Sequence, residues 1–447
     1  MKDLSQRIAA LSPEQQALFK RRLQKKQATQ PQAPKIQKRE ISNQSSIAGK
    51  LNHSIPVSFA QQRTWFQDQL GVKSAVSNNI SIALKIKGSL NIAVLEQSIR
   101  EILQRHEILR TMLRNINGEL TQVISPLGEW KLPFVDLSNF SSVQSETEVQ
   151  RFATEQACQP FNLETDWSLR VKLLQISKTE FVLLLTLHHI AVDAWSIGVF
   201  FRELSALYAA FSNQQRSPLP ELPIQYADFA LWQRQALQGK ALDTDLAYWK
   251  QKLHNAPDVL QLPSDRPRPP IQSFAGKTLS FILPKTLTES LKDLSQQCEA
   301  TLFMTLVAGL QTLLFRYTGQ ENILIGSPIA NRQQSETENL IGCFINTVVL
   351  RTDLSGNPTF RELLQRVRET VWEALAHQSL PFEKLVDELQ LSRSLTHAPL
   401  FQVMLVLQNS FSIETIELPG LTVHHSRIDN QTSQFDLTLH LVESDLG

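Results

Sequence analysis

Two histidines and an aspartate stand close together in the middle of the chain, and these residue types can carry out acid–base chemistry. His188, His189 and Asp193 follow a continuous apolar run, 181–187, and precede a stretch whose apolar residues recur at helical spacing. The apolar run predicts a strand covered on both faces, and Asp193 stands where a helix N-cap belongs. An imidazole changes its charge near neutral pH. The pattern therefore predicts an active site where a buried strand gives way to a helix, with His189 as the group that handles a proton.

The elements that must position this site require more than one ordinary core. The chain has 447 residues, of which 42% are hydrophobic, so we expect two lobes. A formal net charge of +1 argues against nucleic acid as a partner. There is no apolar run of about 18 residues and no apolar signal segment near the N-terminus, so we expect no membrane contact and a cytoplasmic location. The three cysteines, Cys158, Cys298 and Cys343, are far apart and predict buried thiols, with neither disulfides nor a metal site.

The first part of the chain differs in composition from the rest. Residues 1–50 contain a good helix start at Ser12, then a basic helical stretch, then a Pro/Gln-rich segment, 30–39, that predicts a mobile linker. This region is either a solvated tail or a docking element for another protein. The remainder has α/β character, and Pro-rich segments at 217–223 and 263–270 mark a connector. We therefore predict an N-terminal lobe over 54–220 and a C-terminal lobe over 221–447.

Seven short motifs occur in one order along the chain, and together they point to a known family. The chain resembles the condensation domain of nonribosomal peptide synthetases, a member of the HHxxxDG acyltransferase superfamily. The third motif, at His188, departs from the pattern because Ala194 replaces its glycine. The seven motifs lie at residues 58–66, 105–111, 188–194, 226–232, 341–351, 377–383 and 392–401.

A second copy of the HHxxxD pattern shows that these letters alone are not specific. His424, His425 and Asp429 also satisfy it, but they follow no long buried run and precede no amphipathic helix. We interpret His424 and His425 as ordinary strand or loop residues.

The resemblance implies an α/β (α+β) fold of two chloramphenicol-acetyltransferase-like lobes, arranged as a V-shaped pseudo-dimer with a central tunnel. Donor and acceptor peptidyl carrier proteins would dock at opposite mouths and deliver substrates on phosphopantetheine arms, the domain itself binding no cofactor. The expected reaction is amide formation between an upstream acyl or peptidyl thioester and a downstream aminoacyl amine. Adjacent synthetase domains are expected partners, and residues 1–50 would receive an upstream synthetase. The family's last strand and terminal helices are not recognised, so we expect a C-terminal lobe that is truncated at its end.

The resemblance also assigns roles within the site. His189 would accept a proton or orient the attacking amine, and the sequence leaves both open. His188 would support it. Asp193 would be structural and paired with an arginine, because a buried carboxylate needs a partner; Arg332 is the first candidate and Arg63 the second.

Ala194 raises two alternatives. If the glycine of the pattern is needed for a positive φ, alanine costs about 1 kcal/mol; if it leaves room for the arm, the methyl group narrows the tunnel. The first amides of the helix, near Ala194 and Trp195, could stabilise an oxyanion or a carbonyl, and Ser196 is a further candidate for the backbone that lines the tunnel.

Side chains of the other motifs are expected to be structural. Tyr226, Phe229 and Trp232 recur at helical spacing and predict core positions, while Asn346, Pro381 and Phe382 would shape the floor and the crossover between lobes. Two further functions stay open. One is a related acyltransferase that uses an acyl-CoA thioester, and the other is a degenerate module that recruits partners without catalysis.

Overall fold

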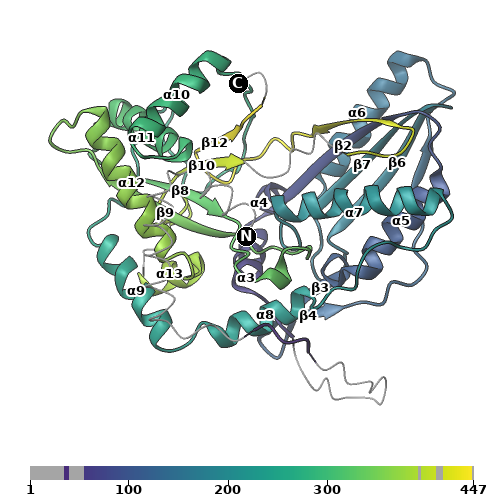
Figure 1. The fold of residues 1–447 in the computed structure, drawn as a ribbon, viewed down its shortest axis with the longest axis horizontal. Helices are drawn as coiled ribbons and strands as arrows, with labels where there is room; N and C mark the ends of the chain where they lie inside the picture. The colour runs from purple at the N-terminus through teal and green to yellow at the C-terminus, as the bar shows by residue number, and fades with distance from the viewer. Residues whose placement is uncertain (1–34, 40–54, 391–393, 409–415, 445–447) are drawn as a thin grey trace.

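Two lobes lie side by side, each built on its own β-sheet (Figure 1). The structure, a computed structural model, describes residues 35–39, 55–390, 394–408 and 416–444. The expected helix near Ser12 lies outside these residues. The mixed α/β class and the two-lobed arrangement expected from the sequence are confirmed.

The first lobe contains a five-stranded sheet in the order β11-β2-β7-β6-β5. Its central strand pairs antiparallel with β2 and β6, and every residue of that strand after the first is buried. The strands are β2 (Asn79–Lys87), β5 (Phe134–Asp136), β6 (Leu169–Ser177), β7 (Glu180–His188) and β11 (Thr422–Arg427).

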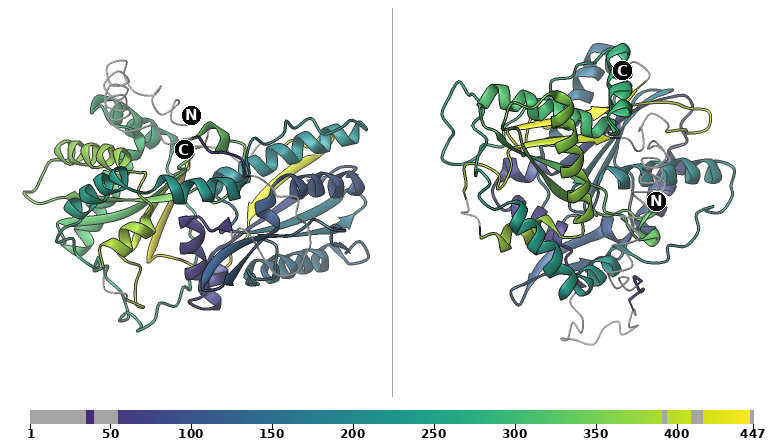
Figure 2. Two further views of the ribbon diagram at one scale, coloured as in Figure 1. Left: turned by 90° about the horizontal axis from the view of Figure 1, so that it is seen from below. Right: turned by 60° about the vertical axis from the view of Figure 1, so that its left-hand side comes forward.

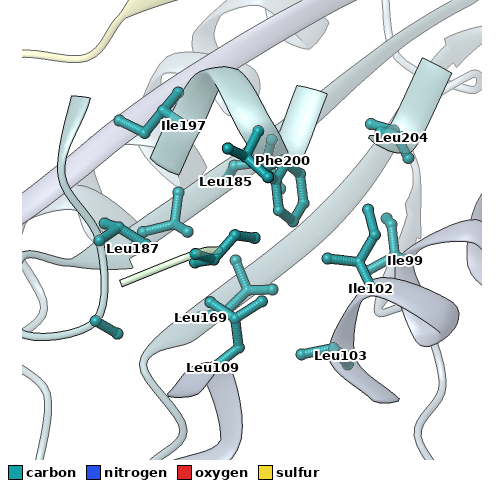
Figure 3. Close-up of a cluster of buried hydrophobic side chains, with 14 of the residues drawn as sticks. Ile99, Ile102, Leu103, Leu109, Leu169, Leu185, Leu187, Ile197, Phe200 and Leu204 are labelled. Carbon is teal, nitrogen blue, oxygen red and sulfur yellow. The ribbon is translucent and has the colours of Figure 1, made fainter. Parts of the chain in front are cut away.

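Helices cover both faces of this sheet, which explains the unbroken apolar run in β7. Leu183, Leu185 and Leu187 belong to a core shared with α5 (Ile92–Arg105) and α7 (Ala194–Ser212). Figure 3 shows Leu185 and Leu187 facing Ile102, Phe200 and their neighbours. The alternate residues Val182 and Leu184 join a separate cluster with Ala153 of α6 (Ser142–Cys158).

The second lobe contains a four-stranded sheet in the order β12-β10-β8-β9. It packs in a core of its own with α11 and α12, with Val307, Leu364 and Val403 almost fully buried. Its elements are β8 (Asn322–Ile329), β9 (Asn346–Asp353), β10 (Val403–Gln408), β12 (Leu437–Val442), α9 (Lys240–Lys252), α10 (Lys285–Gln297), α11 (Leu302–Thr318), α12 (Phe360–Ala376), α13 (Phe382–Glu388) and η2 (Ser335–Thr337).

The smaller elements gather near the junction of the lobes. A three-stranded sheet in the order β1-β4-β3 lies beside α8 and α3. These elements are β1 (Ile55–Pro56), α3 (Phe59–Asp68), α4 (Val72–Ser77), η1 (Glu107–Arg110), β3 (Thr111–Ile116), β4 (Glu119–Ile124) and α8 (Tyr226–Ala236).

The chain crosses between the lobes after residue 220, so a boundary at 220/221 does not separate the two sheets. After β10 the chain leaves the second sheet, adds β11 to the edge of the first sheet beside β2, and returns as β12. The yellow strand that reaches along the first lobe in Figures 1 and 2 is this segment. Residues 340–344 and α8 likewise contribute Phe344 and Tyr226 to the core of the first lobe.

Part of the predicted linker is packed against the first lobe. Within 30–39, residues 30–34 lie outside the described residues, but Ile36 is only 6% exposed and belongs to the core of the first lobe. The prediction of a mobile linker is therefore wrong for residues 35–39.

Among the described residues, no single helix is long and apolar enough to cross a membrane. Within the same residues, the helices α10 and α11 together pass a test of length and composition alone, but they are bent by 104° relative to each other.

Two glycines provide a paired test of the second core. At Gly326 in β8, an added Cβ would lie 2.2 Å from the ring of Phe401, whereas at Gly309 in α11 it would meet no atom within 4 Å. We expect Gly326→Ala to lower the free energy of unfolding by about 1–3 kcal/mol, because the core is already filled. Gly309→Ala should raise it by about 0.5–1 kcal/mol through helix propensity. Urea unfolding followed by circular dichroism measures both, and equal stability of the two variants would contradict this packing.

Candidate active site

The turn between β7 and α7 is held by backbone hydrogen bonds on both sides. The amide of His188 donates to the carbonyl of Ser168 at 3.0 Å, and the amide of His189 donates to the carbonyl of Asn78 at 2.8 Å. Asp193 caps α7 by accepting a hydrogen bond from the amide of Ser196 at 2.8 Å. The strand, the turn and the N-cap are therefore where the sequence predicts them.

His188 is a buried support whose two ring nitrogens are both occupied. Its Nε2 lies 3.1 Å from Oδ1 of Asp68, at the end of α3, and its Nδ1 accepts from the amide of Ile190 at 3.2 Å. The ring of Phe161 packs edge-on against it. This pattern places the proton on Nε2 and leaves no ring atom for a substrate.

His189 is partly exposed and keeps one ring nitrogen available. Its Nδ1 lies 3.8 Å from Sγ of Cys343, and no partner for Nε2 is found within the described part of the chain. Burial lowers the pKa of His189, and the positive charge of Arg63 lowers it further. The imidazole is therefore neutral near pH 7 and can accept a proton or a hydrogen bond at Nε2.

A buried ion pair fixes the start of α7 to the other half of the chain. Nη2 of Arg332 lies 3.1 Å from Oδ1 of Asp193, and the two residues are 7% and 3% exposed. The amide of Phe344 donates to Oδ2 of Asp193 at 3.0 Å. Arg332 also donates to the carbonyls of Thr337 and Leu340. The pair expected between Asp193 and Arg332 is thus present, and most of its hydrogen-bonding capacity is used.

The second candidate partner, Arg63, is not bonded to Asp193. Arg63 in α3 instead pairs with Glu383 in α13, with 3.2 Å between Nη1 and Oε1, and approaches the hydroxyl of Thr347. It therefore bridges the two lobes and acts on His189 through its charge.

Ser196 and Trp195 are tied into the same region through their side chains. The Ser196 hydroxyl accepts from Arg332 at 2.7 Å and from the amide of Gly342 at 3.0 Å. The amide of Ser196 caps α7 on Asp193 and is therefore already engaged in a hydrogen bond. Trp195 donates from its indole to the carbonyl of Glu338 at 2.8 Å. Donation to substrate by the amides of Ala194 and Trp195 stays a prediction.

Ala194 is not strained. It is the first residue of α7, is exposed, and is absent from the described non-glycine residues with positive φ. The first alternative, a glycine needed for a positive φ, therefore does not apply, because the backbone here is helical. The alternative, that the methyl group occupies space near the turn, stays a prediction.

The segment 341–344 comes just before β9 of the second lobe, packs in the core of the first lobe and contacts the turn that bears His189. The amide of Ile341 donates to Nδ1 of His106 at 3.3 Å, and the carbonyl of Cys343 accepts from the hydroxyl of Tyr226 at 2.6 Å. An added Cβ at Gly342 would lie 2.1 Å from the Tyr226 ring, so only glycine allows this approach. Cys343 is thereby held against His189.

The remaining motif residues have structural roles. Tyr226 and Phe229 are buried in the core of the first lobe, with Trp232 packed against it. Asn346 donates to the carbonyls of Gln378 and Leu380 and accepts from the amide of Phe382, so it holds the turn between α12 and α13.

The two histidines of the second HHxxxD copy lie in β11. His424 and His425 pair with Lys85 and Leu84 of β2, and no helix follows them directly. Our interpretation of them as strand residues is confirmed.

Sequence reasoning missed three residues of the site, namely Asp68, Cys343 and Glu383. Asp68 ends the helix of the first motif, which is the only local signal it offers. Among the described residues, no group of three or more His, Cys, Asp or Glu side chains could hold a metal ion.

Removal of one partner of the buried ion pair provides a test. We expect Arg332→Met to lower the free energy of unfolding by about 3–5 kcal/mol, because Asp193 is left buried without a counter-charge. The double variant Asp193→Asn/Arg332→Met should recover part of this loss. Lys292→Ala, which removes an exposed pair with Glu443, should cost less than about 1 kcal/mol. Equal effects of Arg332→Met and Lys292→Ala in urea unfolding would refute the role of the pair.

The chain matches proteins of known class over most of its length. The family model of the condensation domain matches residues 51–447. The chain is 50% identical to one of the linear gramicidin synthase subunits of Brevibacillus parabrevis over 88% of its length, spanning 5% of that protein. It is 40% identical over 99% of its length to phosphinothricin tripeptide synthetase PhsC of Streptomyces viridochromogenes, spanning 40% of it. The chain thus spans less than half the length of each of these relatives.

Solved structures share the fold. The X-domain from teicoplanin biosynthesis superposes with a TM-score of 0.80 at 30% identity, covering 89% of this chain and 87% of that one. The first condensation domain of the calcium-dependent antibiotic synthetase superposes with a TM-score of 0.70 at 20% identity, covering 87% of each chain. The ordered motifs, the two-lobed fold and these matches lead to one conclusion: the chain belongs to the condensation-domain family of nonribosomal peptide synthetases.

Proposed function

We propose that this domain forms an amide bond between an upstream acyl or peptidyl thioester and the amine of a downstream aminoacyl thioester. The observation that carries the proposal is the contrast between the two histidines. His188 has both nitrogens occupied, whereas Nε2 of His189 has no partner among the described residues and stands on a turn fixed by the buried pair of Asp193 and Arg332.

The reaction requires that the two substrates be held in the attacking orientation and that one proton be removed from the attacking amine. The amine nitrogen attacks the thioester carbonyl, the tetrahedral intermediate collapses, the C–S bond breaks, and the thiolate leaves. A neutral His189 takes the proton from the attacking nitrogen or hydrogen-bonds it in the attacking orientation. The proton is then available to the departing sulfur. No covalent acyl-enzyme is needed, because a thioester is already activated.

Carrier proteins would supply both substrates on phosphopantetheine arms, which belong to the carriers and not to this domain. The proposed partners are therefore a donor and an acceptor carrier, together with adjacent synthetase domains. Two observations support them. The relatives are synthetases of which this chain spans 5% and 40%, and the site lies near the junction of two lobes.

A second candidate is a domain that recruits a partner protein without transferring acyl groups. The specific observation in its favour is the 29% identity, with a TM-score of 0.78, to the X-domain in a complex with OxyB from teicoplanin biosynthesis. A third candidate is an acyl-CoA-dependent transferase, which would take its acyl group from a CoA thioester and not from a carrier protein.

The deciding experiment compares the two HHxxxD copies. With loaded donor and acceptor carriers, we expect His189→Ala to reduce dipeptide formation by about 10²–10⁴-fold, the usual contribution of a general base. His424→Ala changes the matching histidine of the second copy and should stay within about twofold of the unsubstituted domain. Mass spectrometry of the acceptor carrier gives the product directly.

Each outcome selects one function. Unchanged turnover in His189→Ala would refute the role of His189. No transfer by the unsubstituted domain, combined with binding of a partner protein, would favour recruitment. Transfer from acyl-CoA without a donor carrier would favour the CoA-dependent reaction.

The pH dependence provides an independent test. Burial holds the pKa of His189 below its ordinary value of about 6.5. The neutral form that accepts a proton therefore persists to more acidic pH, and the rising limb due to His189 should lie below pH ~6.5. His189→Gln should lose this limb while keeping any limb that arises from the amine of the substrate. A His189-dependent limb above pH 7 in single-turnover rates would contradict this assignment.

A further inference from the structure

Five residues ahead of the domain are packed onto the first lobe. In the segment 35–39, Ile36 is 6% exposed and inserts into the core, while Lys35, Gln37 and Lys38 are exposed. The segment lies beside α8 in Figure 1. It precedes the residues matched by the family model, which begin at 51.

Arg39 binds two carboxylates that come from two different motifs. Its Nη1 lies 3.0 Å from Oδ1 of Asp228, its backbone amide donates to the same oxygen at 3.1 Å, and its Nη2 bonds to Glu107. The side chains of Arg39 and Glu107 are 16% and 17% exposed, and that of Asp228 is fully buried.

Hydrogen bonds that do not involve Arg39 also hold Asp228 and Glu107 in place. Oδ2 of Asp228 accepts from the amide of Gln225 at 2.7 Å and so caps α8, while the amide of Glu107 donates to the side chain of Gln225 at 3.2 Å. The other carboxylate oxygen of Asp228, Oδ1, is not used in capping α8. It accepts hydrogen bonds from both the guanidinium group and the backbone amide of Arg39. A buried carboxylate without a cation is costly, so this partner stabilises the site.

Two other arginines, both in the second motif, have different partners. Arg105 pairs with Glu203 at 2.9 Å, and Arg110 donates to the carbonyls of Leu103 and Ser125. Arg39 is therefore the cation that bonds both Asp228 and Glu107 within the described residues.

We propose that Glu107, Asp228 and the apolar residues beneath Ile36 form a docking surface for the chain's own segment 35–39. Ile36 and Arg39 are its two anchors. This inference does not depend on the proposed catalysis. Its consequence is that Lys35, the first residue of the segment, lies at a fixed place on the first lobe.

Anchoring by Ile36 and Arg39 limits how far any preceding element can move from the first lobe. For comparison, a flexible chain of about 20 residues spreads its far end over roughly 25 Å. Docking at 35–39 removes that freedom. A partner bound by residues 1–34 would then be presented at the edge formed by η1 and α8, with a higher effective concentration there.

Hydrogen exchange of the full chain tests the anchor. In the unsubstituted protein, the amides of residues 36–39 should be protected, above all that of Arg39. We expect Arg39→Ala to raise their exchange rate at least tenfold and Glu107→Gln to raise it less, because Asp228 remains. Lys38→Ala removes a neighbouring exposed charge and should leave the rates within twofold.

Amides of β7, deep in the first lobe, report whether a variant remains folded. If Arg39→Ala also loosens β7, the comparison rests on Glu107→Gln, which keeps the shape of the side chain. Exchange at the rate of a free peptide in the unsubstituted protein would overturn the proposal. So would equal rates in Lys38→Ala and in the anchor variants while β7 stays protected.

Discussion

The buried pair of Asp193 and Arg332 is the interaction on which the site depends. Two charges removed from water are costly, and they are tolerated only when their attraction is joined by further hydrogen bonds. Here Asp193 also accepts from the amides of Ser196 and Phe344, and Arg332 donates to two carbonyls. The pair therefore works as a clamp that sets the turn bearing His189 against a segment from the other half of the chain.

The same clamp joins the two lobes. Gly342 reaches Ser196 and the Tyr226 ring, and Arg63 bonds to Glu383 across the junction. A site assembled in this way has a geometry that neither lobe specifies alone. Such preorganisation suits a reaction whose main demand is the orientation of two activated substrates. The first six motifs are far apart in the sequence, and contacts between them connect the site: Arg63 with Glu383, His106 with Ile341, Tyr226 with Cys343, and Asp193 with Phe344.

Local features were predictable, and long-range ones were not. The strand before His188, the N-cap at Asp193 and the core helices follow from periodicity and capping, which act over a few residues. Asp68 and Cys343 could not be found in this way, because they reach the histidines only through tertiary packing. The docked segment at Ile36 was misread because its composition resembles a linker while two side chains anchor it. The backbone conformation of Ala194 could not be predicted, because no sequence pattern at this position determines φ.

The edge of the first sheet has a consequence for how the protein is made. β2 ends at Lys87, but its outer neighbour β11 ends only at Arg427. At typical rates of about 5–20 residues per second, the ribosome needs on the order of tens of seconds to synthesise the intervening chain. Throughout that interval the backbone groups along one side of β2 have no strand to pair with, and open edges invite association with other chains. Until β11 has been made, the edge of β2 is therefore the part of the first lobe that is open to pairing with another chain.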